Sequence, residues 1–350
     1  MGFASVEEIE TRAKEQECQL WETILHDDMT ERQVDRLESI GKMSSMYLAM
    51  KEANESYDKD LKSQSGLSGG DGEKMMEEVR KMQNLTGEFV GTVMANALKM
   101  GESNACMKRI VAAPTAGACG VLPAVLITYE QFHKVPEAKM LEGMYIAAGV
   151  GQVIAERACI AGAQGGCQAE IGSASAMAAG GVVHLSGGSA KEIANAVALA
   201  LKNLLGLACD PVAGLVEVPC VKRNVMGAVN ALTSADLTSA GIFSKIPPDE
   251  VIDAMRSIGR SMSEDIRETG KRRTCGEHRP EWRSVSGWPG AEHRKHDAVD
   301  GKNEINRFWL FDKATHMTDL FDRWVVMVLL FLRYRNFLNF MNKFVDNIVT

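Results

Sequence analysis

The sequence predicts a mainly α-helical protein, built as a multi-helix domain with Gly- and Pro-rich loops. Three observations support this fold class: apolar residues recur with helical spacing, the helical segments are rich in Ala, Gly and Met, and strand-like alternation is nearly absent. Short Gly/Pro turns separate the segments, as in helix bundles. With 350 residues and 45% hydrophobic side chains, the chain can bury a large core.

The N-terminal segment predicts two amphipathic helices, each opened by a capping box. The first would begin at Ser5, with Glu8 three residues later, and the second at Thr30, with Gln33 three residues later. The apolar positions are Val6, Ile9, Leu20, Trp21 and Ile24 in the first helix and Val34, Leu37, Ile40, Tyr47 and Leu48 in the second. Both helices are expected to serve packing or partner contacts rather than chemistry.

The segment that follows, up to Thr269, predicts five further helices joined by short turns. They are Glu88 to Met100, Glu137 to Ala161, Ala190 to Leu205, Asn224 to Ala235 and Asp249 to Thr269. The second of them carries a run of small residues, namely Ala147, Ala148, Gly149 and Gly151. Small side chains permit close helix–helix approach, so we expect tight packing around this helix.

Two loops between the helices have a composition that suits ligand binding. Ser63 to Met75, SQSGLSGGDGEKM, ends where a helix can start, and its backbone N–H groups could cradle a carboxylate. Val111 to Ala124, VAAPTAGACGVLPA, is broken by Pro114 and Gly117 before Cys119 and a further helix. A solvated linker and an interhelical turn with a buried thiol are the simpler interpretations, and neither loop alone specifies an activity.

Three Cys residues stand in Gly- or Pro-rich turns: Cys167 in GAQGGCQAE, Cys209 in GLACDPVAGLVE and Cys220 in VEVPCVKRN. Small neighbours let backbone N–H groups approach sulfur and leave room for a bulky inorganic cluster. Three thiols in such loops suggest a metal centre with one position left open. The alternative is three buried apolar thiols, which is how most intracellular Cys behave.

Composition and charge favour small-molecule chemistry in the cytoplasm. Eight Cys, in a chain that opens MGFASVEEIE without a signal-peptide pattern, fit a reducing compartment. A net charge of −7 without a basic stripe argues against nucleic acid as a partner. The apolar run from Trp324 to Leu332 is too short for a bilayer span of ~20 residues. We expect this run to form a helix and expect no membrane partner.

The character of the chain changes after Lys271. The last 80 residues hold four of the five Trp but only four of the 32 Gly. Basic residues number 25 against 36 acidic ones up to Gly270, and 14 against 10 afterwards. We therefore divide the chain into a domain of residues 1–270 and an atypical tail of residues 271–350.

Four runs, taken together, resemble a known family: SGLSGGDGEKM, IVAAPTAGACGVLPA, GAQGGCQAEIGSASAMAA and GLACDPVAGLVEVPCVKRN. In this order and spacing they closely resemble the alpha chain of bacterial iron–sulfur-dependent L-serine dehydratase. The resemblance covers most of residues 1–270, and long ungapped matches of this kind are highly specific. Ser68 stands where the family usually has Thr, and Ala118 where it usually has Ser, but neither change removes a metal ligand.

The resemblance implies an enzyme, a cofactor and a partner. The cofactor is a [4Fe–4S] cluster held by Cys167, Cys209 and Cys220, whose fourth iron is free to bind substrate, with no pyridoxal phosphate. The chain would be the mainly helical catalytic subunit of a hetero-oligomer with a separate beta chain. Its reaction would be the deamination of L-serine to pyruvate and ammonia.

The resemblance also selects candidate site residues. For the substrate carboxylate they are Ser65, Gly66, Ser68, Gly69 and Gly70 in the first loop and Thr115 in the second. Supporting residues beside the cluster loops would be Glu170, Asp210, Glu217, Arg223 and Asn224. Cys119 is a rival fourth ligand, ranked as a neighbour because the family's cluster uses three Cys. Among the other thiols, we predict packing roles within helices for Cys18, Cys106 and Cys159, while Cys275 lies in the tail.

Elimination of water from serine needs a base at one end and an electrophile at the other, because the α-proton is weakly acidic and hydroxide is a poor leaving group. An iron without a protein ligand can coordinate the substrate carboxylate and hydroxyl. His133 and His184 are the only His between the first and the last of the four matched runs, and a lone His beside a helix is more often structural than catalytic. The base is therefore left unassigned, and it could lie on the beta chain.

Two other classes of protein remain as alternatives. The first is an iron–sulfur electron-transfer protein. Its cluster would have a protein ligand on every iron, so Cys119 would have to join the other three Cys as the fourth ligand. A structural zinc protein would be expected to contain CxxC pairs, and the chain has none.

A third alternative is an inactive product of a damaged gene. Family alpha chains continue from RETG into Gly-Gly-Leu-Ala, whereas this chain reads GKRRTCGEH. The codons AGG AGG ACT TGC, for Arg272 to Cys275, read GGA GGA CTT GC when shifted by one base, which restores Gly-Gly-Leu-Ala. We favour a frameshift over a genuine extension, because composition, charge and periodicity change at the same residue.

Overall fold

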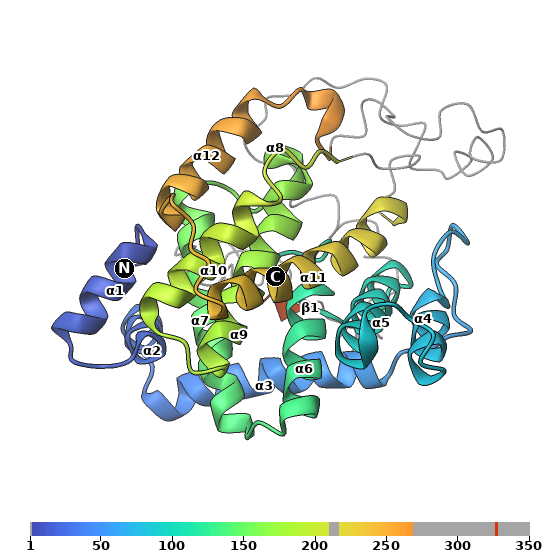
Figure 1. The fold of residues 1–350 in the computed structure, drawn as a ribbon, viewed down its shortest axis with the longest axis horizontal. Coiled ribbons are helices and arrows are strands. Elements are labelled where there is room, and N and C mark those ends of the chain that lie inside the picture. Colours follow the sequence, from blue (N-terminus) through green and yellow to red (C-terminus); the bar gives the residue numbers. More distant parts are fainter. Residues whose placement is uncertain (1, 210–216, 269–325, 328–350) are drawn as a thin grey trace, which may run out of the picture.

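The computed structural model describes residues 2–209, 217–268 and 326–327, and it confirms the mainly α fold class (Figure 1). The elements, in chain order, are α1 (Val6–Glu15), α2 (Leu20–Arg32), α3 (Arg36–Glu55), α4 (Asp71–Arg80), α5 (Gly87–Ala105), β1 (Val111–Ala112), α6 (Val121–His133), α7 (Glu137–Arg157), α8 (Gly162–Gly165), the π-helix η1 (Gln168–Gly172), α9 (Ser173–Leu185), α10 (Ala190–Lys202), α11 (Val218–Ser239), α12 (Pro248–Ser261), the 3₁₀ helix η2 (Glu264–Ile266) and β2 (Val326–Met327).

The core is organised around α9, whose 13 residues are all buried. Helices α6, α7, α10 and α11 pack around it. Small residues allow this close packing: a Cβ on Gly181 of α9 would lie 3.0 Å from the Gly143 carbonyl of α7. On the other side of α7, a Cβ on Gly149 would lie 2.5 Å from the Ile24 side chain of α2. The tight packing predicted around α7 is therefore confirmed.

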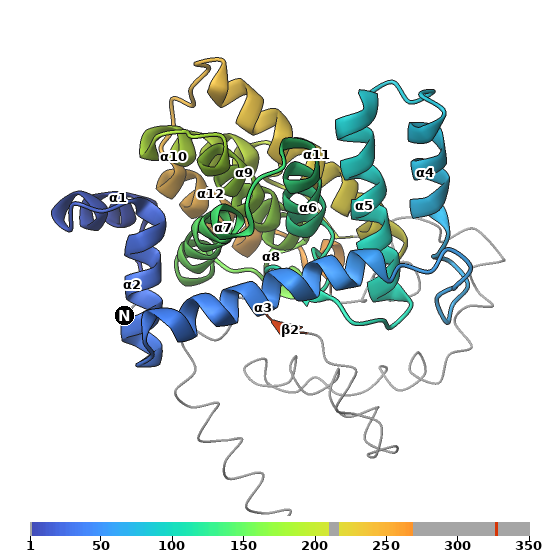
Figure 2. The ribbon, with the colours of Figure 1, turned by 90° about the horizontal axis from the view of Figure 1, so that it is seen from below.

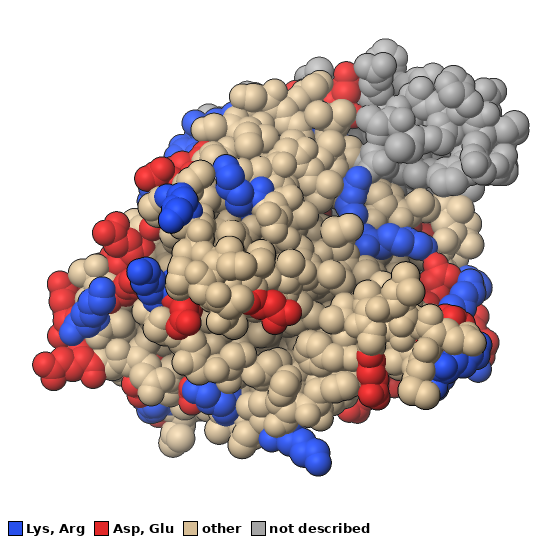
Figure 3. Space-filling model, in the orientation of Figure 1, with Lys and Arg blue, Asp and Glu red and all other residues tan. Residues whose placement is uncertain are grey.

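The remaining helices flank this bundle. In Figure 2, α3 runs along one side of it, α4 and α5 form an antiparallel pair at one end, and α1 and α2 lie at the other end. Figure 3 shows that acidic and basic side chains lie mostly around the rim of the face drawn in Figure 1. Within the described residues, no helix combines the length and the apolar character needed to cross a bilayer.

The two predicted helix starts in the N-terminal segment have different outcomes. Ser5 caps α1 as predicted, because its hydroxyl accepts a hydrogen bond from the Glu8 N–H at 2.9 Å. The other half of the predicted capping box does not form, since the Glu8 carboxylate accepts from the Ala4 N–H instead, at 2.7 Å. The predicted start at Thr30 is wrong, since Thr30 lies inside α2 and its hydroxyl donates to the carbonyl one turn earlier at 2.8 Å. The next helix, α3, begins after Asp35, whose carboxylate accepts from the Glu38 N–H at 2.8 Å.

The five further helices are confirmed, with shifted ends. Helix α7 ends at Arg157, short of the predicted Ala161, and α12 ends at Ser261, short of the predicted Thr269. The early end of α12 has a local cause: the Ser263 hydroxyl caps η2, so the chain leaves the α12 axis there.

A two-residue strand from the tail pairs with the core. Strand β2 lies parallel to β1, with Val111 opposite Val326 and Ala112 opposite Met327. The prediction of a helix from Trp324 to Leu332 is therefore wrong at these two positions, where the edge of β1 offers backbone groups for pairing. The rest of the tail lies outside the described residues, and the division at residue 270 stays a prediction.

Candidate metal centre

Three buried thiols meet where three helical segments begin or end. Cys167 directly precedes η1, Cys209 follows α10, and Cys220 lies in the first turn of α11. Their Sγ atoms all lie within 4.8 Å of one another, and none of the three residues is more than 4% exposed. We call this group the three-thiol site. The structure thus brings together the Cys residues selected from the sequence, while their role as ligands stays a prediction.

Gln168 holds the Cys167 and Cys209 segments together. Its N–H donates to the Leu207 carbonyl at 3.0 Å, and its side-chain oxygen accepts from the Gly206 N–H at 2.9 Å. Gly166, before Cys167, has a φ of 69°, and a Cβ there would lie 3.0 Å from the Leu207 carbonyl. Glycine is therefore required at this turn. The π-helix that follows Cys167 is a distortion frequently found at functional sites.

One of the three thiols is held as a thiolate. Hydrogen bonds with the Cys209 and Cys220 thiols lower the pKa of Cys167 to about 3, and the guanidinium of Arg223, with Nη1 2.9 Å from the Cys167 Sγ, lowers it further. The same thiolate raises the pKa of Cys209 and of Cys220 above the usual value. Since metal ligation requires thiolates, binding at this site should release protons.

The donor set fits a metal centre. Thiolates are preferred ligands of zinc, copper(I) and iron–sulfur clusters. On a tetrahedral ion with metal–sulfur bonds of about 2.3 Å, two sulfurs lie about 3.8 Å apart, and the three sulfurs here all lie within 4.8 Å of one another. A cluster binds each sulfur through a different iron, so these side chains would rotate outward to hold one. In either case three protein sulfurs leave one position open on a four-coordinate metal.

Cys119 is not a member of the three-thiol site. It is buried among Ala53, Met100, Ile110 and Ala112, and its Sγ faces the Met100 carbonyl at 3.6 Å. Burial raises the pKa of Cys119 to about 12. These are the surroundings of a packing thiol, so within the described residues no fourth Cys joins the site.

The prediction that Cys18, Cys106 and Cys159 lie within helices is wrong, since each lies just past a helix end. Cys18 is in the turn between α1 and α2, which the sequence analysis treated as one helix. Cys106 is the C-cap of α5, and Cys159 follows α7. All three are partly exposed and lie outside the three-thiol site. Cys275 and Asp210 lie outside the described residues.

The first predicted substrate loop is attached to the start of α11, near Cys220. The Ser65 hydroxyl donates to the carboxylate of Glu217, the N-cap residue of α11, at 2.7 Å. Lys222 of α11 forms an ion pair with Asp71, at the end of the same loop, at 2.8 Å. The loop is therefore fixed beside the helix that carries Cys220.

The second predicted substrate loop is attached to the same helix through Asn224. Its Oδ1 accepts from the Gly120 N–H at 2.8 Å, and its Nδ2 donates to the carbonyls of Gly117 at 2.9 Å and Cys220 at 2.8 Å. Both loops that were selected for substrate binding thus meet the segment that carries Cys220.

Two buried hydroxyl groups in these loops, those of Ser68 and Thr115, have no hydrogen bond of good geometry, although the Thr115 hydroxyl faces the Glu170 carboxyl. Buried hydroxyls of this kind are rare in folded proteins, and a functional role or a bound water or ion is among the explanations. Gly66 and Gly70 have φ angles of 75° and 85°, which Gly adopts readily. The N–H of Gly69 already donates to a carboxylate of the protein itself, at 3.2 Å.

Two carboxyl groups lie beside the three-thiol site, that of the buried Glu170 and that of the partly buried Glu268. Burial, and next the charge of Glu268, raise the pKa of Glu170 well above its usual value, while the Thr115 hydroxyl opposes the rise. Burial and the Cys167 thiolate raise the pKa of Glu268 to about 7. Both carboxyl groups point toward Gly162, which has no side chain to displace them. Glu268 was not among the site residues selected from the sequence, where its only signal was its place in the RETG run.

Neither His133 nor His184 lies at the three-thiol site. His133 is exposed, and its ring stacks on that of Tyr129 with centroids 4.3 Å apart. His184 is buried near the C-terminal end of α9, and its Nε2 lies 2.9 Å from a carboxylate oxygen of Glu142. These contacts agree with the structural role expected for both His residues.

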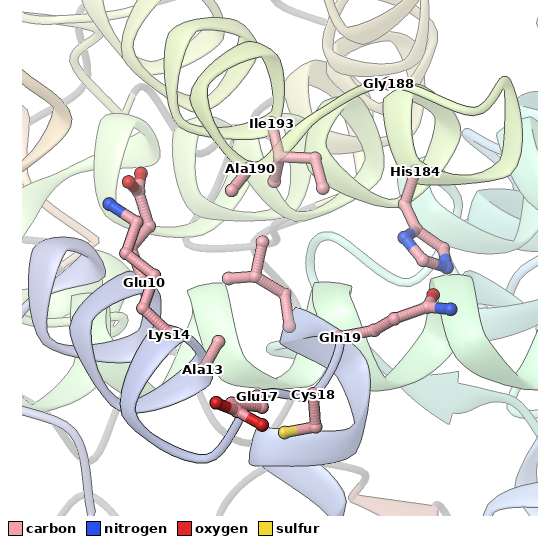
Figure 4. Close-up of a pocket in the computed structure, with 11 residues that line it drawn as sticks. Glu10, Ala13, Lys14, Glu17, Cys18, Gln19, His184, Gly188, Ala190 and Ile193 are labelled. Atoms are coloured by element: carbon pink, nitrogen blue, oxygen red, sulfur yellow. The ribbon is translucent and has the colours of Figure 1, made fainter.

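A cavity of about 360 Å³ lies beside His184, between the turn that joins α1 to α2 and the start of α10 (Figure 4). Its lining includes Ala13, Lys14, Gln19 and Ile193. None of the predicted site residues lines this cavity.

The fold and the three-thiol site together define the class of this protein, a helical protein whose three clustered thiols suit a metal centre. Its family follows from the similarity to known proteins. The family of serine dehydratase alpha chains matches residues 15–273, and the chain belongs to this family.

Individual relatives agree with this assignment. The probable L-serine dehydratase alpha chain of Bacillus subtilis is 42% identical over 269 residues, which are 77% of this chain and 90% of that protein. The L-serine dehydratase alpha chain of Peptoniphilus asaccharolyticus is 45% identical over 57% of this chain and 69% of its own length. L-serine dehydratase TdcG of Escherichia coli is 42% identical over 50% of this chain, but that match covers only 39% of TdcG.

Proposed function

We propose that this chain is the catalytic alpha chain of an iron–sulfur-dependent L-serine dehydratase, a lyase that converts L-serine to pyruvate and ammonia. The observation that carries the proposal is the three-thiol site, with its open position, in a chain of the serine dehydratase alpha family. Cys167, Cys209 and Cys220 would hold a [4Fe–4S] cluster, and no pyridoxal phosphate is required.

The bound cluster would supply a Lewis-acidic iron that makes the substrate hydroxyl a better leaving group. The chain's own residues prepare the site. Arg223 balances the negative charge of the Cys167 thiolate from 2.9 Å away. The hydroxyls of Ser68 and Thr115, buried and without well-aligned partners, are the groups available to donate to the substrate carboxylate.

Glu268 is a candidate for the general base, which the sequence left unassigned. A general base works best when its pKa lies near the working pH, and the pKa of Glu268 is about 7 beside the three-thiol site. The buried Glu170 carboxyl next to it would hold a proton at neutral pH, because burial raises its pKa. The beta chain remains the alternative source of the base.

The proposed complex contains a separate beta chain and resides in the cytoplasm. The alpha-chain names of the relatives from B. subtilis and P. asaccharolyticus support a partner chain. The longer TdcG sequence, of which the match covers 39%, is compatible with further protein beside the alpha-like region. We propose no nucleic-acid or membrane partner.

The test is anaerobic reconstitution with iron(II) and sulfide in the presence of the beta chain. Iron and sulfide are then counted, and the 2-oxo acid product is assayed, which is pyruvate from L-serine and, in a parallel reaction, 2-oxobutanoate from L-threonine. We expect equal amounts of bound iron and sulfide, and pyruvate only from reconstituted protein. Bound iron without sulfide would contradict the cluster.

The tail requires a second arm of this experiment. A variant in which everything after Lys271 is replaced by the family's Gly-Gly-Leu-Ala ending is reconstituted beside the chain as given. If only this variant forms pyruvate, the tail impairs an otherwise complete site. If neither forms pyruvate with a full complement of iron and sulfide, the dehydratase activity is refuted.

A further inference from the structure

A carboxylate of the protein itself occupies the N-terminus of α4. Glu102 of α5 is 1% exposed, and its Oε1 accepts hydrogen bonds from the N–H groups of Gly69 at 3.2 Å and Asp71 at 2.8 Å. Its Oε2 accepts from the Gly72 N–H at 3.1 Å and from the Tyr57 hydroxyl at 2.5 Å. A helix N-terminus attracts anions through its free N–H groups and its dipole, so this position is filled.

The loop is shaped to receive that carboxylate. Gly69 has a φ of 128°, and a Cβ there would clash with the Leu61 carbonyl. A Cβ on Gly72 would lie 2.7 Å from the Lys99 side chain. Burial, and next the hydrogen bond to Glu102, raise the pKa of Tyr57, so its hydroxyl stays protonated and donates to the carboxylate.

The C-terminal end of α5, which carries Glu102, also contacts the second predicted substrate loop, residues 111–124. Asn104, two residues after Glu102, donates from its side chain to the Ala116 carbonyl at 3.0 Å. Ala116 follows Thr115, one of the two residues with a buried hydroxyl lacking a well-aligned partner. The last turn of α5 therefore contacts both loops selected for substrate binding, one through Glu102 and one through Asn104.

We propose that Glu102 is a positioning residue for substrate binding, a role that rests on the proposed function. By occupying the N–H groups at the start of α4, it excludes the substrate carboxylate from them. It also holds the loop that carries the Ser68 hydroxyl, which would bind the substrate together with the Thr115 hydroxyl of the second loop. Recognition of the substrate carboxylate is thereby assigned to hydroxyls rather than to the N–H groups of Gly69, Asp71 and Gly72, which Glu102 occupies.

The kinetic test replaces Glu102 by Gln, which keeps the size of the side chain and removes its charge. Hydrogen bonds to a charged group are stronger than neutral ones, and the amide brings an N–H₂ against the N–H donors. In the reconstituted complex with the beta chain, we expect the KM for L-serine to rise about tenfold or more. The iron and sulfide content should stay that of the wild type, and kcat should change less than KM.

Glu77→Gln is the matched control. Glu77 lies on α4, its side chain is 53% exposed, and its ion-pair contact with Lys81 is long, at 3.9 Å. The same chemical change there should leave KM unaltered. Glu102→Asp keeps the charge but shortens the side chain, so it should give a KM between those of the wild type and Glu102→Gln. If Glu102→Gln does not accumulate as folded protein, the KM of Glu102→Asp alone tests the positioning role.

A second measurement does not depend on activity. Hydrogen exchange of the full chain should show faster exchange of the amides of residues 66–72 in Glu102→Gln than in the wild type or in Glu77→Gln. A wild type without activity would refute the proposed function, yet this measurement would still test the loop contact. Unchanged exchange, or an unchanged KM in both Glu102 variants, would overturn the positioning role.

Discussion

Replacing Asn224 by Ala tests whether the turn of residues 114–120 must be tied to α11 for the three-thiol site to bind metal. Asn224 is 1% exposed, and its side chain makes all three of its hydrogen bonds within this region, to Gly117, Gly120 and Cys220. Alanine preserves the helix and removes these bonds together.

The free energy of unfolding should fall by about 2–6 kcal/mol in Asn224→Ala. The Cys220 carbonyl keeps its main-chain bond within α11, but the Gly120 N–H and the Gly117 carbonyl lose this partner. Each unsatisfied buried group costs about 1–3 kcal/mol, which gives the stated range for two. The Tm should fall by about 2–4 °C for each kcal/mol.

The control is Asn230→Ala on the same helix. Asn230 is 8% exposed and also makes three side-chain hydrogen bonds, to Ser175, Ala200 and Asn203, but these join α11 to α9 and to the end of α10. Urea unfolding of the apo proteins should show comparable losses of stability. Iron bound after reconstitution, measured well below both Tm values, should fall only in Asn224→Ala. Equal iron binding in the two variants would refute the reasoning.

Four further predictions follow from the site and the chain. Replacing any one member of the three-thiol site by Ala should abolish both the visible absorbance of the cluster and turnover, whereas Cys119→Ala should keep the absorbance; the opposite pattern would show that the ligand set is wrong. Activity should be lost in air, restored by iron(II) with a thiol reductant, and insensitive to carbonyl-trapping reagents; an air-stable enzyme inhibited by such reagents would exclude the iron mechanism. Burial lowers the pKa of His184 below 6.5 in the folded protein, so His184 takes up a proton at a higher pH in the unfolded chain than in the folded one. The stabilisation of the fold by His184, compared with His184→Gln, should therefore be complete above pH 6.5 and should decline as the pH falls below this value. Urea unfolding between pH 5 and 8 measures it. Limited proteolysis should cut first between Arg272 and Lys302, and replacing the residues after Lys271 by the family ending should raise soluble yield; a tail as resistant as the core would argue for an integrated extension.

Local signals in the sequence account for most of the helices, though not for α9 or for the break between α1 and α2, and for several helix ends. Ser5 caps α1 because the hydroxyl that the capping pattern requires lies three residues from its N–H partner. The same pattern at Thr30 failed, because a Thr hydroxyl inside a helix can also bond the carbonyl one turn back, and Asp35 is the better cap. Patterns of this kind predict which contacts are possible, and neighbouring residues decide which of them forms.

The cradle at the start of α4 illustrates the limit of such signals. The sequence indicates an anion site there, from Gly residues ahead of a helix, and the structure contains one. The anion, however, is Glu102 of the next helix, 30 residues further along the chain than Gly72. No local pattern distinguishes a carboxylate of a substrate from a carboxylate of the protein, because both satisfy the same N–H groups.

The sequence by itself determined the helical class, most of the helices around α9 but not α9 itself, the family resemblance and the choice of Cys167, Cys209 and Cys220. Only the tertiary structure decided that these thiols converge within 4.8 Å, that Cys119 packs elsewhere, and that Glu268 reaches the site. The physical reason is the range of the interactions. Helical periods and caps depend on residues within one turn of each other, whereas the charges and distances of the site are set by packing between segments far apart in the chain.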